Sequence, residues 1–220
     1  YTEKEGLSAN IVYAMSKDGN GNIWISTNYG GINKFDGKNF THFNLAQGLS
    51  NNKVRSILED SNGNIWLSTE GGGINKLNEG GFSYLPHNEV LANNRVRPII
   101  KDKNGNIWFG TEGNGVGKYD AENFAEPSGN FSYFKEKGNE KFTGQRSLMQ
   151  DATGNIWIGE TRGNIISLNG QVFTNYTPEN ENSENMIFDI KQDRQGNIWF
   201  AKKYDGISKF NGQYFTRYTE

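Results

Sequence analysis

Short runs of alternating apolar and polar residues, each bounded by Gly and Asn, fill most of the chain. One stretch shows the full pattern, with four runs in succession: Val54–Glu59, Asn64–Thr69, Ile74–Leu77 and Phe82–Leu85. Runs rich in β-branched and aromatic residues between such clusters are typical of β-strands. Asp60-Ser61-Asn62-Gly63 and Gly71–Gly73 separate the first three runs. The pattern therefore predicts four short antiparallel strands joined by tight turns.

This pattern recurs five times, and five tryptophans mark the copies. The tryptophans are separated by 42, 42, 49 and 42 residues, and each follows Gly-Asn-Ile and lies six residues after an aspartate. The pairs are Asp18 and Trp24, Asp60 and Trp66, Asp102 and Trp108, Asp151 and Trp157, and Asp193 and Trp199. We expect the seven extra residues of the third copy in a surface loop around Ala121–Asn130, because exposed loops absorb insertions at low cost.

A four-stranded repeat of this length has the size of a propeller blade. We therefore predict an all-β fold, a five-bladed β-propeller of four-stranded antiparallel blades, as a single domain over residues 1–220. The expected blades are residues 6–47, 48–90, 91–138, 139–180 and 181–220. Tyr1-Thr2-Glu3 and Tyr218-Thr219-Glu220 hold equivalent positions of the repeat. We expect a closed ring, in which Tyr1-Thr2 would extend the outer edge of the last blade, although five units of a longer array would end in the same way.

Composition supports a turn-rich β fold and excludes several kinds of site. Gly accounts for 28 residues and Pro for 4, 13% of residues are aromatic, and the formal net charge is −2. Such a charge offers no basic field for nucleic acid, and no apolar run approaches the ~20 residues of a membrane span. Because the chain has no Cys, disulfides, zinc–thiolate sites and thiol nucleophiles are excluded. The chain begins at Tyr1 without a signal peptide, which we interpret as a mature product or an excised piece.

The Asp-x-x-Gly-Asn segment before each Trp is interpreted as structural. The Asp carboxylate can accept backbone N–H bonds of the turn, and the Gly can supply the positive φ that ends a short hairpin loop. The Trp would then pack between blades. Calcium is disfavoured, because Thr153 and Gln195 replace the mid-loop Asn and no copy has the later bidentate Glu of a calcium loop. We expect no metal and no cofactor.

The repeat resembles the two-component regulator propeller repeat, most fully in Gly48–Leu77 and Gly6–Gly37. The shared consensus is Gly-Leu-Ser-x-Asn, then Asp-x-x-Gly-Asn-Ile-Trp-x-x-Thr-x-x-Gly-Gly-Ile-x-Lys-Phe-Asp-Gly. The resemblance implies a bacterial sensor propeller, periplasmic or extracellular, of the kind found in hybrid sensor kinases that respond to glycans. The chain departs from the family in having five repeats and no kinase, and Glu160 and Lys202 replace the Thr after the Trp.

The position five residues before each Asp is the most informative for function. It holds Tyr13, Arg55, Arg97, Arg146 and Phe188, which we expect to form a ring at the mouth of the axial channel. Facing loops would add Asn28, Tyr29, Glu70, Glu112, Glu160, Arg162, Lys203 and Tyr204. Because Arg binds carboxylates and aromatic faces stack on sugars, the ring predicts a pocket for an anionic or sugar-like ligand. Alternatively, the three arginines pair with Glu70, Glu112 and Glu160 and only neutralise the channel.

Three functions fit these features. The first is a non-catalytic sensor that binds a small molecule or an oligosaccharide and signals to a downstream kinase domain. The second is a scaffold that binds a protein partner through its flat face. The third is a lyase, since streptogramin B lyase is similar in repeat style; Glu160 is then the one unusual carboxylate available as a base. His42 and His87 are expected to face solvent, away from the axis.

Overall fold

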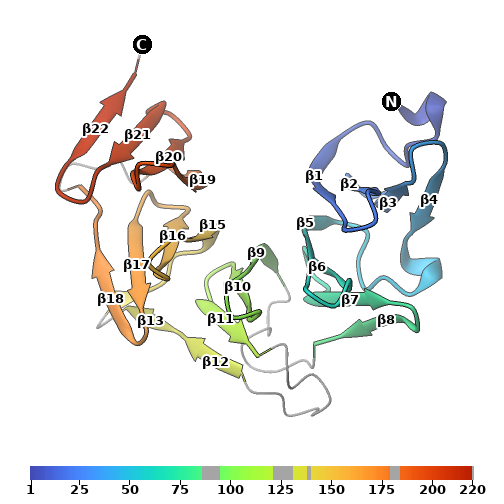
Figure 1. Cartoon of the computed structure of the whole chain (residues 1–220), viewed down its shortest axis with the longest axis horizontal. Coiled ribbons are helices and arrows are strands. Elements are labelled where there is room, and N and C mark those ends of the chain that lie inside the picture. Colours follow the sequence, from blue (N-terminus) through green and yellow to red (C-terminus); the bar gives the residue numbers. More distant parts are fainter. Residues whose placement is uncertain (86–94, 121–130, 138–139, 179–183, 220) are drawn as a thin grey trace.

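The computed structural model describes residues 1–85, 95–120, 131–137, 140–178 and 184–219. Five antiparallel sheets of four strands each are arranged around a common centre, with the first strand of each sheet innermost and the last outermost (Figure 1). This is the all-β, five-bladed arrangement expected from the repeat. The insertion predicted around Ala121–Asn130, and His87, lie outside the described residues.

Each blade runs outward in chain order. Blade 1 contains β1 (Val12–Lys17), β2 (Ile23–Thr27), β3 (Gly31–Phe35) and β4 (Phe40–Phe43). Blade 2 contains β5 (Val54–Glu59), β6 (Ile65–Thr69), β7 (Ile74–Asn78) and β8 (Gly81–Tyr84). Blade 3 contains β9 (Val96–Lys101), β10 (Ile107–Thr111), β11 (Val116–Tyr119) and β12 (Phe131–Phe134). Blade 4 contains β15 (Gln145–Gln150), β16 (Ile156–Glu160), β17 (Ile165–Asn169) and β18 (Val172–Asn175). Blade 5 contains β19 (Ile187–Gln192), β20 (Ile198–Lys202), β21 (Ile207–Phe210) and β22 (Phe215–Tyr218).

A few short elements lie between the blades. Two 3-10 helices, η1 (Glu3–Glu5) and η2 (Leu45–Gln47), precede blades 1 and 2. Both have a polar N-cap residue and a glycine in the left-handed region at the C-cap. The strands β13 (Glu136–Lys137) and β14 (Glu140–Lys141) form a small separate sheet before blade 4. Within the described ranges, no helix is long and apolar enough to cross a membrane.

The conserved turn of each repeat is held by its aspartate, as predicted. In blade 2, the Asp60 carboxylate accepts hydrogen bonds from the backbone N–H groups of Asn62 and Asn64, both at 2.9 Å. The same carboxylate also accepts the indole N–H of Trp66 at 2.8 Å. The Asp–Trp bond recurs in all five blades. The turn and the packing tryptophan, which the sequence suggested as separate features, are thus one unit.

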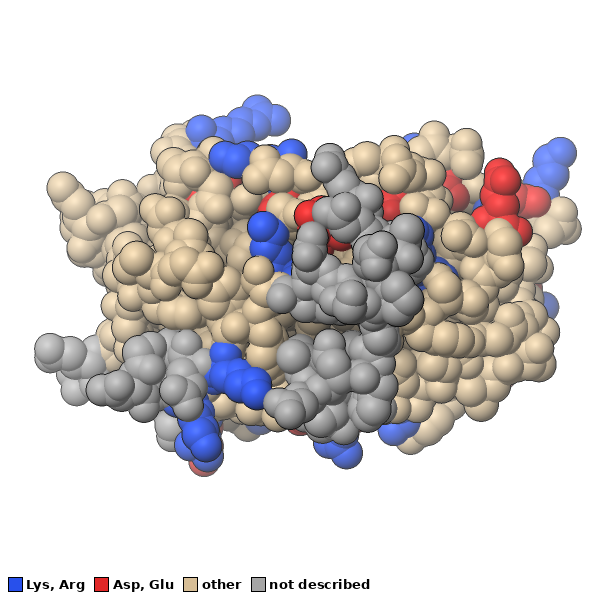
Figure 2. Space-filling view, turned by 90° about the horizontal axis from the view of Figure 1, so that it is seen from below, with Lys and Arg blue, Asp and Glu red and all other residues tan. Residues whose placement is uncertain are grey.

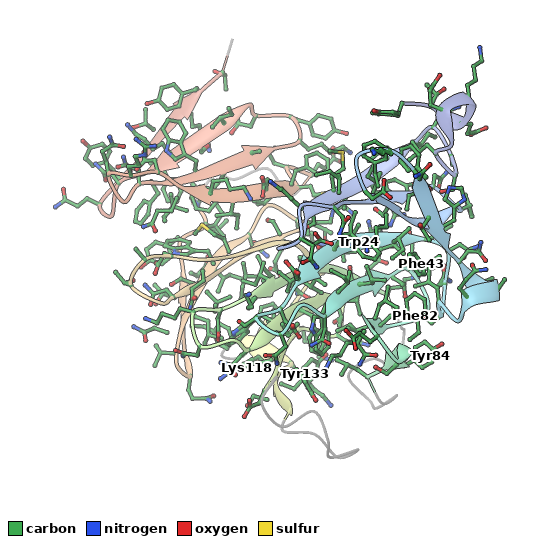
Figure 3. All side chains as sticks on the ribbon, turned by 45° about the vertical axis from the view of Figure 1, so that its right-hand side comes forward. Trp24, Phe43, Phe82, Tyr84, Lys118 and Tyr133 are labelled. Carbon is green, nitrogen blue, oxygen red and sulfur yellow. The ribbon has the colours of Figure 1, made fainter. Side chains whose placement is uncertain are left out.

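Four apolar cores fill the spaces between successive blades. Each combines the Trp and the first apolar residue of the third strand of one blade with the two inner strands of the next. Between blades 1 and 2, for example, Trp24 and Ile32 pack with Val54, Ile57 and Leu67. Figure 3 shows the outer continuation of this contact, in which Trp24, Phe43 and Phe82 follow one another. Most of the burial therefore lies between sheets, as a propeller requires.

The arc of five blades is open between blade 5 and blade 1 (Figure 1). Among the described residues, neighbouring inner strands pack side by side from β1 to β19, but β19 and β1 do not pack in this way. Tyr1 packs on Phe35 and Phe40 of its own blade, with ring centres 4.9 and 5.6 Å apart. It does not extend the last blade. The expected closed ring of five blades is therefore absent from this structure, because the first and last blades do not meet.

Candidate functional site

The residues predicted to ring the axis lie at a β-bulge in every blade. In each pair of innermost strands, the register shifts around the position five residues before the Asp. In blade 2, Val54 pairs with Thr69 and Ser56 pairs with Ser68, which leaves Arg55 without a partner on the neighbouring strand. A bulge locally bends the strand and re-aims a side chain. The same irregularity thus recurs in all five blades at the position that holds Tyr, Arg or Phe.

These five side chains line one central cavity. The cavity has a volume of about 380 Å³, within the usual range for ligand pockets. Tyr13, Arg55, Arg97, Arg146 and Phe188 all line it, together with neighbouring residues of the innermost strands. All five side chains, three guanidinium groups and two aromatic rings, therefore border one cavity.

Arg55 is held on two sides. Its guanidinium lies 4.1 Å from the ring centre of Tyr13 and donates hydrogen bonds to the Glu70 carboxylate, one of them from Nε at 2.8 Å. Tyr13 in turn donates its hydroxyl proton to Asn28 Oδ1 at 2.8 Å. Burial alone would raise the pKa of Glu70, but the hydrogen bonds and charge of Arg55 outweigh it and the pKa is lowered. Arg55 is thus paired, as the neutralisation hypothesis predicted.

Arg97 is paired less completely. Its Nη2 lies 3.5 Å from Glu112, a carboxylate that Arg95 also approaches, at 3.2 Å. The Nε of Arg97 is buried without a hydrogen-bond partner among the described residues. An unsatisfied buried donor costs free energy that a bound acceptor would recover. The Arg97 guanidinium therefore has one buried N–H group without a described acceptor.

Arg146 breaks the pattern of arginine–glutamate pairs. Its expected partner, Glu160, is fully buried and accepts hydrogen bonds from Thr143 N at 2.7 Å and Asn164 Nδ2 at 2.6 Å. Glu160 is not among the residues that line the cavity. Among the described contacts, Arg146 has only Phe188, whose ring centre lies 5.5 Å from the guanidinium carbon. The expected pair of Arg146 with Glu160 is therefore wrong, because the Glu160 carboxylate is bonded to Thr143 and Asn164 instead.

The environment of Arg146 is electrostatically unfavourable for its charge. Burial lowers the pKa of Arg146, and the nearby positive charges of Arg97 and Arg55 lower it further. Glu112 and Glu70 act in the opposite direction without cancelling these effects. Because a guanidinium remains protonated in proteins, Arg146 presents a partly desolvated positive charge to the cavity. A bound anion would relieve this charge.

Blade 5 contributes two charged residues that sequence reasoning missed. Asp189 and Lys191 line the cavity beside Phe188, and Lys191 Nζ lies 3.3 Å from Asp189 Oδ1. Both side chains are largely exposed. Their positions on the innermost strand could have marked them, but the repeat comparison considered only the position of Phe188. Each cavity-lining cation that the structure describes, apart from Arg146, thus has a carboxylate within 4 Å.

The loop residues predicted to face the ligand lie around the cavity rather than in it. Tyr29, Tyr204 and Arg162 are exposed and are not among the cavity-lining residues. Lys53 lies over the ring of Tyr29 at 4.5 Å, and Lys203 lies over that of Tyr204 at 4.4 Å. Tyr29 is the one described non-glycine residue with a positive φ, at 61°. Glu70 pairs with Arg55 and Glu112 lies close to Arg97, and neither carboxylate is among the cavity-lining residues.

The face of the molecule in Figure 2 shows no block of positive charge on the described residues. In the view of Figure 2, the described Lys and Arg side chains are interspersed with Asp and Glu rather than gathered in one block. The described residues also contain no group of three or more His, Asp or Glu side chains that could hold a metal ion. His42 is exposed on β4, and its Nε2 lies 2.8 Å from the Gly6 carbonyl oxygen, far along the blade from the innermost strand.

Comparison with known families identifies the repeat. The model of the two-component regulator propeller matches residues 6–29, 48–71, 90–113 and 182–201. The resemblance seen in the sequence is thereby confirmed over these four segments. The fourth unit, in which Glu160 replaces the usual Thr, falls outside the matched segments. No curated protein sequence is significantly similar to the chain.

Several solved structures share the fold. The extracellular domain assigned to the hybrid two-component system BT4673 of B. thetaiotaomicron matches 91% of this chain with a TM-score of 0.74 and 20% identity. The chain covers 27% of that domain. A second extracellular domain from this organism, BT3049, matches all of the chain with a TM-score of 0.61 and 23% identity. The chain covers 36% of that domain. Virginiamycin B lyase from Staphylococcus aureus matches 94% of the chain and is covered over 69% of its length, with a TM-score of 0.74 and 17% identity.

Proposed function

We propose that this chain, an array of two-component regulator propeller repeats, is a non-catalytic sensor module that binds an anionic or sugar-like ligand in its axial cavity. The proposal rests on the repeat type and on the side chains that line the cavity. Arginine binds carboxylates through two parallel hydrogen bonds, and aromatic faces stack on flat apolar surfaces. A ring that combines both groups suits a ligand with an acidic group and a ring-shaped body.

The state of Arg146 is the observation that carries the proposal. A guanidinium that only neutralised the channel would have a carboxylate beside it, as Arg55 has Glu70. Arg146 instead lies half-buried against Phe188, near two other arginines. Such an arrangement costs stability in the empty protein and returns it when an anion binds. Functional sites often hold charges in this way.

The expected ligand follows from the groups that remain available. One acidic group would bind the guanidinium of Arg146, which lines the cavity. Phe188 and Tyr13 are each close to half exposed and would contact the body of the ligand. A saccharide that carries one carboxylate, such as a uronic acid, satisfies both requirements. An aromatic carboxylic acid would satisfy the same contacts.

The cellular setting is proposed from the solved relatives. Two of them are extracellular domains assigned to hybrid two-component systems, and the chain spans about a quarter of the first. We place this propeller on the periplasmic or extracellular side of a bacterial membrane, with a kinase domain downstream as its signalling partner. Coexpression with the flanking segments of its gene would test this placement through ligand-dependent phosphorylation.

Binding to the cavity is tested by calorimetry with matched ligands. Glucuronate-containing oligosaccharides, benzoate derivatives and their neutral counterparts would be titrated into the chain and into Arg146→Ala. We expect acidic members to bind and Arg146→Ala to weaken them by at least tenfold, since loss of a charged hydrogen bond costs about 1.5–3 kcal/mol. Arg194→Ala removes the same charge from an exposed turn and should leave the affinity unchanged.

A second substitution separates the two parts of the ligand. Phe188→Ala should weaken acidic and neutral saccharides alike, whereas Arg146→Ala should affect only the acidic ones. The proposal is wrong if no member of the panel binds, or if Arg146→Ala binds acidic ligands as tightly as the unmodified chain. Thermal stabilisation by saturating ligand gives an independent readout, because a ligand of the native state raises the unfolding midpoint.

The lyase alternative has less support from the geometry. Its proposed base was Glu160, which is fully buried, bonded to Thr143 and Asn164, and absent from the cavity lining. A general base must reach the proton that it removes. The likeness to virginiamycin B lyase, at 17% identity, concerns the fold alone.

A further inference from the structure

Each cavity residue at a bulge has a companion, here called the facing residue, which directly follows the second strand of the same blade. The bulge residues are Tyr13, Arg55, Arg97, Arg146 and Phe188. The facing residues, in the same order, are Asn28, Glu70, Glu112, Thr161 and Lys203. The backbone N–H of each facing residue donates a hydrogen bond to the carbonyl oxygen two residues before the bulge residue, at 2.8–3.0 Å in all five blades. The five pairs therefore share one backbone arrangement and can be compared side chain by side chain.

In blades 2 and 3 the facing residue is a carboxylate that takes up the charge of the bulge arginine. Arg55 Nε donates a hydrogen bond to Glu70 at 2.8 Å. Arg97 Nη2 lies 3.5 Å from Glu112. The uncharged pair of blade 1 is also joined by a hydrogen bond, at 2.8 Å. In these three blades the bulge residue and the facing residue thus interact with each other.

Blade 4 has an arginine at the bulge but no carboxylate at the facing position. Its facing residue is Thr161, whose hydroxyl donates a hydrogen bond to the Thr143 carbonyl oxygen at 3.1 Å. Glu160 precedes Thr161 and holds the position of a fully buried threonine in blades 1–3. The described contact of Arg146 is therefore the ring of Phe188, and the difference from blades 2 and 3 lies at the facing position.

We propose that Thr161 determines the charge selectivity of the axial cavity: the missing carboxylate at this position leaves Arg146 open to an anion and limits the site to ligands with one acidic group. This inference rests on the proposed binding of an acidic ligand at Arg146. Three arginines line the cavity, but those of blades 2 and 3 already have carboxylates beside them. A paired guanidinium offers fewer hydrogen bonds to an incoming acid.

The shared backbone arrangement says what a carboxylate at this position would do. A Glu in place of Thr161 would start from the same backbone hydrogen bond as Glu70 and should reach Arg146 as Glu70 reaches Arg55. It would compete with the ligand for the same guanidinium. Specificity often depends on such a repulsive or competing element as much as on the attractive one.

The first test compares two substitutions of the same shape. Thr161→Glu adds the carboxylate, and Thr161→Gln adds the same side chain without its charge. In titration calorimetry with glucuronate and benzoate, we expect Thr161→Glu to weaken binding at least about tenfold and Thr161→Gln to change it less than about threefold. Neutral counterparts should bind both variants alike. Equal losses of acid binding in the two variants would overturn the proposal, because side-chain volume and not charge would then be decisive.

The reverse substitution gives blade 2 the pair of blade 4. Glu70→Thr leaves Arg55 with the ring of Tyr13, much as Arg146 has the ring of Phe188. We expect glucuronate to bind at least about threefold more tightly to this variant, and glucarate, which has two carboxylates, to gain more than glucuronate. Unchanged or weaker binding of both acids would contradict the limit of one acidic group.

A third test needs no ligand. Pairing with Arg146 should raise the thermal midpoint of Thr161→Glu by about 2–4 °C relative to Thr161→Gln, and Arg146→Ala should remove this difference. Equal midpoints with Arg146 present would mean that the facing position does not reach it, and the proposal would fail.

The outcomes separate this proposal from the function on which it rests. If the unmodified chain binds no acid, the proposed function and its selectivity are both wrong. If acids bind the unmodified chain and bind Thr161→Glu and Thr161→Gln equally, only the role of Thr161 is wrong.

Discussion

The guanidinium of Arg55 lies 4.1 Å from the ring centre of Tyr13, across the boundary between blades 1 and 2. Its other side is fixed by Glu70. An aromatic ring, a guanidinium and a carboxylate from two blades therefore form one unit at the edge of the cavity. Arg55 is therefore paired within this unit, whereas the described contact of Arg146 is the ring of Phe188.

Removal of the carboxylate from this unit should weaken the fold. We expect Glu70→Ala to lower the free energy of unfolding by about 1–2 kcal/mol, because Arg55 then keeps a partly buried charge without its hydrogen-bonded partner. Glu112→Ala is the matched control. Its pairs are longer and more exposed, so the loss should be about 0.5 kcal/mol. Urea unfolding of both variants measures the difference, and equal losses would contradict the expected ranking.

The aspartate of the repeat should matter according to its burial. In blade 2, Asp60→Ala leaves the indole N–H of the fully buried Trp66 without an acceptor, which should cost about 2–3 kcal/mol. In blade 5, Trp199 is partly exposed and Asp193 is less buried, so water can replace the lost acceptor. We expect Asp193→Ala to cost about half as much or less. Chemical denaturation of the two variants provides the comparison.

Acid should destabilise the protein through these turns. Burial acts to raise the pKa of Asp60 and Asp102, but hydrogen bonds from Trp, Asn and backbone N–H groups outweigh it and both pKa values are lowered. Because the folded pKa lies below the unfolded one, each carboxylate contributes stability that is complete above about pH 4 and is lost as pH falls through the folded pKa.

The measurement is the urea midpoint between pH 3 and pH 7. We expect a plateau at neutral pH and a decline below about pH 4. Asp60→Asn cannot titrate at this position, so its decline should be shallower than that of the unmodified chain. Parallel pH profiles would show that Asp60 does not contribute to acid unfolding.

Two glycines with positive φ should respond differently to alanine. Gly31 has a φ of 75°, and a Cβ there would lie 2.2 Å from the Phe43 carbonyl oxygen. Gly31→Ala should therefore cost more than about 3 kcal/mol, since both strain and a backbone clash oppose it. Gly37 has a φ of 95° with open space around it, so Gly37→Ala should cost only about 1 kcal/mol. Thermal unfolding of the two variants distinguishes these contributions.

The backbone conformation of Tyr29 should lower the stability of the fold. Its φ of 61° is of the kind that Gly71 and Gly113 hold at the equivalent positions of blades 2 and 3. Tyr29→Gly relieves this strain and should raise the free energy of unfolding by about 0.5 kcal/mol after the added chain entropy is deducted. If Tyr29 contacts the ligand, the same variant should bind more weakly. A lower stability would mean that the loop around Tyr29 depends on its side chain.

Sequence reasoning found the repeat, its strands and the chemical character of the ring. The predicted run Val54–Glu59 coincides with β5, and Ile65–Thr69 differs from prediction by one residue. Such agreement is expected, because alternation and Gly/Asn turns are local signals. The five residues that border the cavity were also found, because comparison of the repeats shows which side chain each one has at the same position.

Other features of the site were not visible in the sequence. The bulge that frees Arg55 from the strand ladder depends on the register between two strands. The loss of the Arg146 partner depends on Glu160 bonding to Thr143 and Asn164. The contribution of Asp189 and Lys191 to the cavity lining depends on the position of blade 5 beside blade 4.

The sequence by itself determined how many blades there are, how each one is built and which side chains face the axis. Only the tertiary structure decided which charges are paired and whether the ends of the array meet. The physical reason is the range of the forces involved. Turns and strands follow from neighbours along the chain, whereas ion pairing and ring closure depend on where residues far apart in sequence come to lie. Met15 and Ile207 look like ordinary core residues in the repeat, and only the open arc shows that nothing in the described chain covers them.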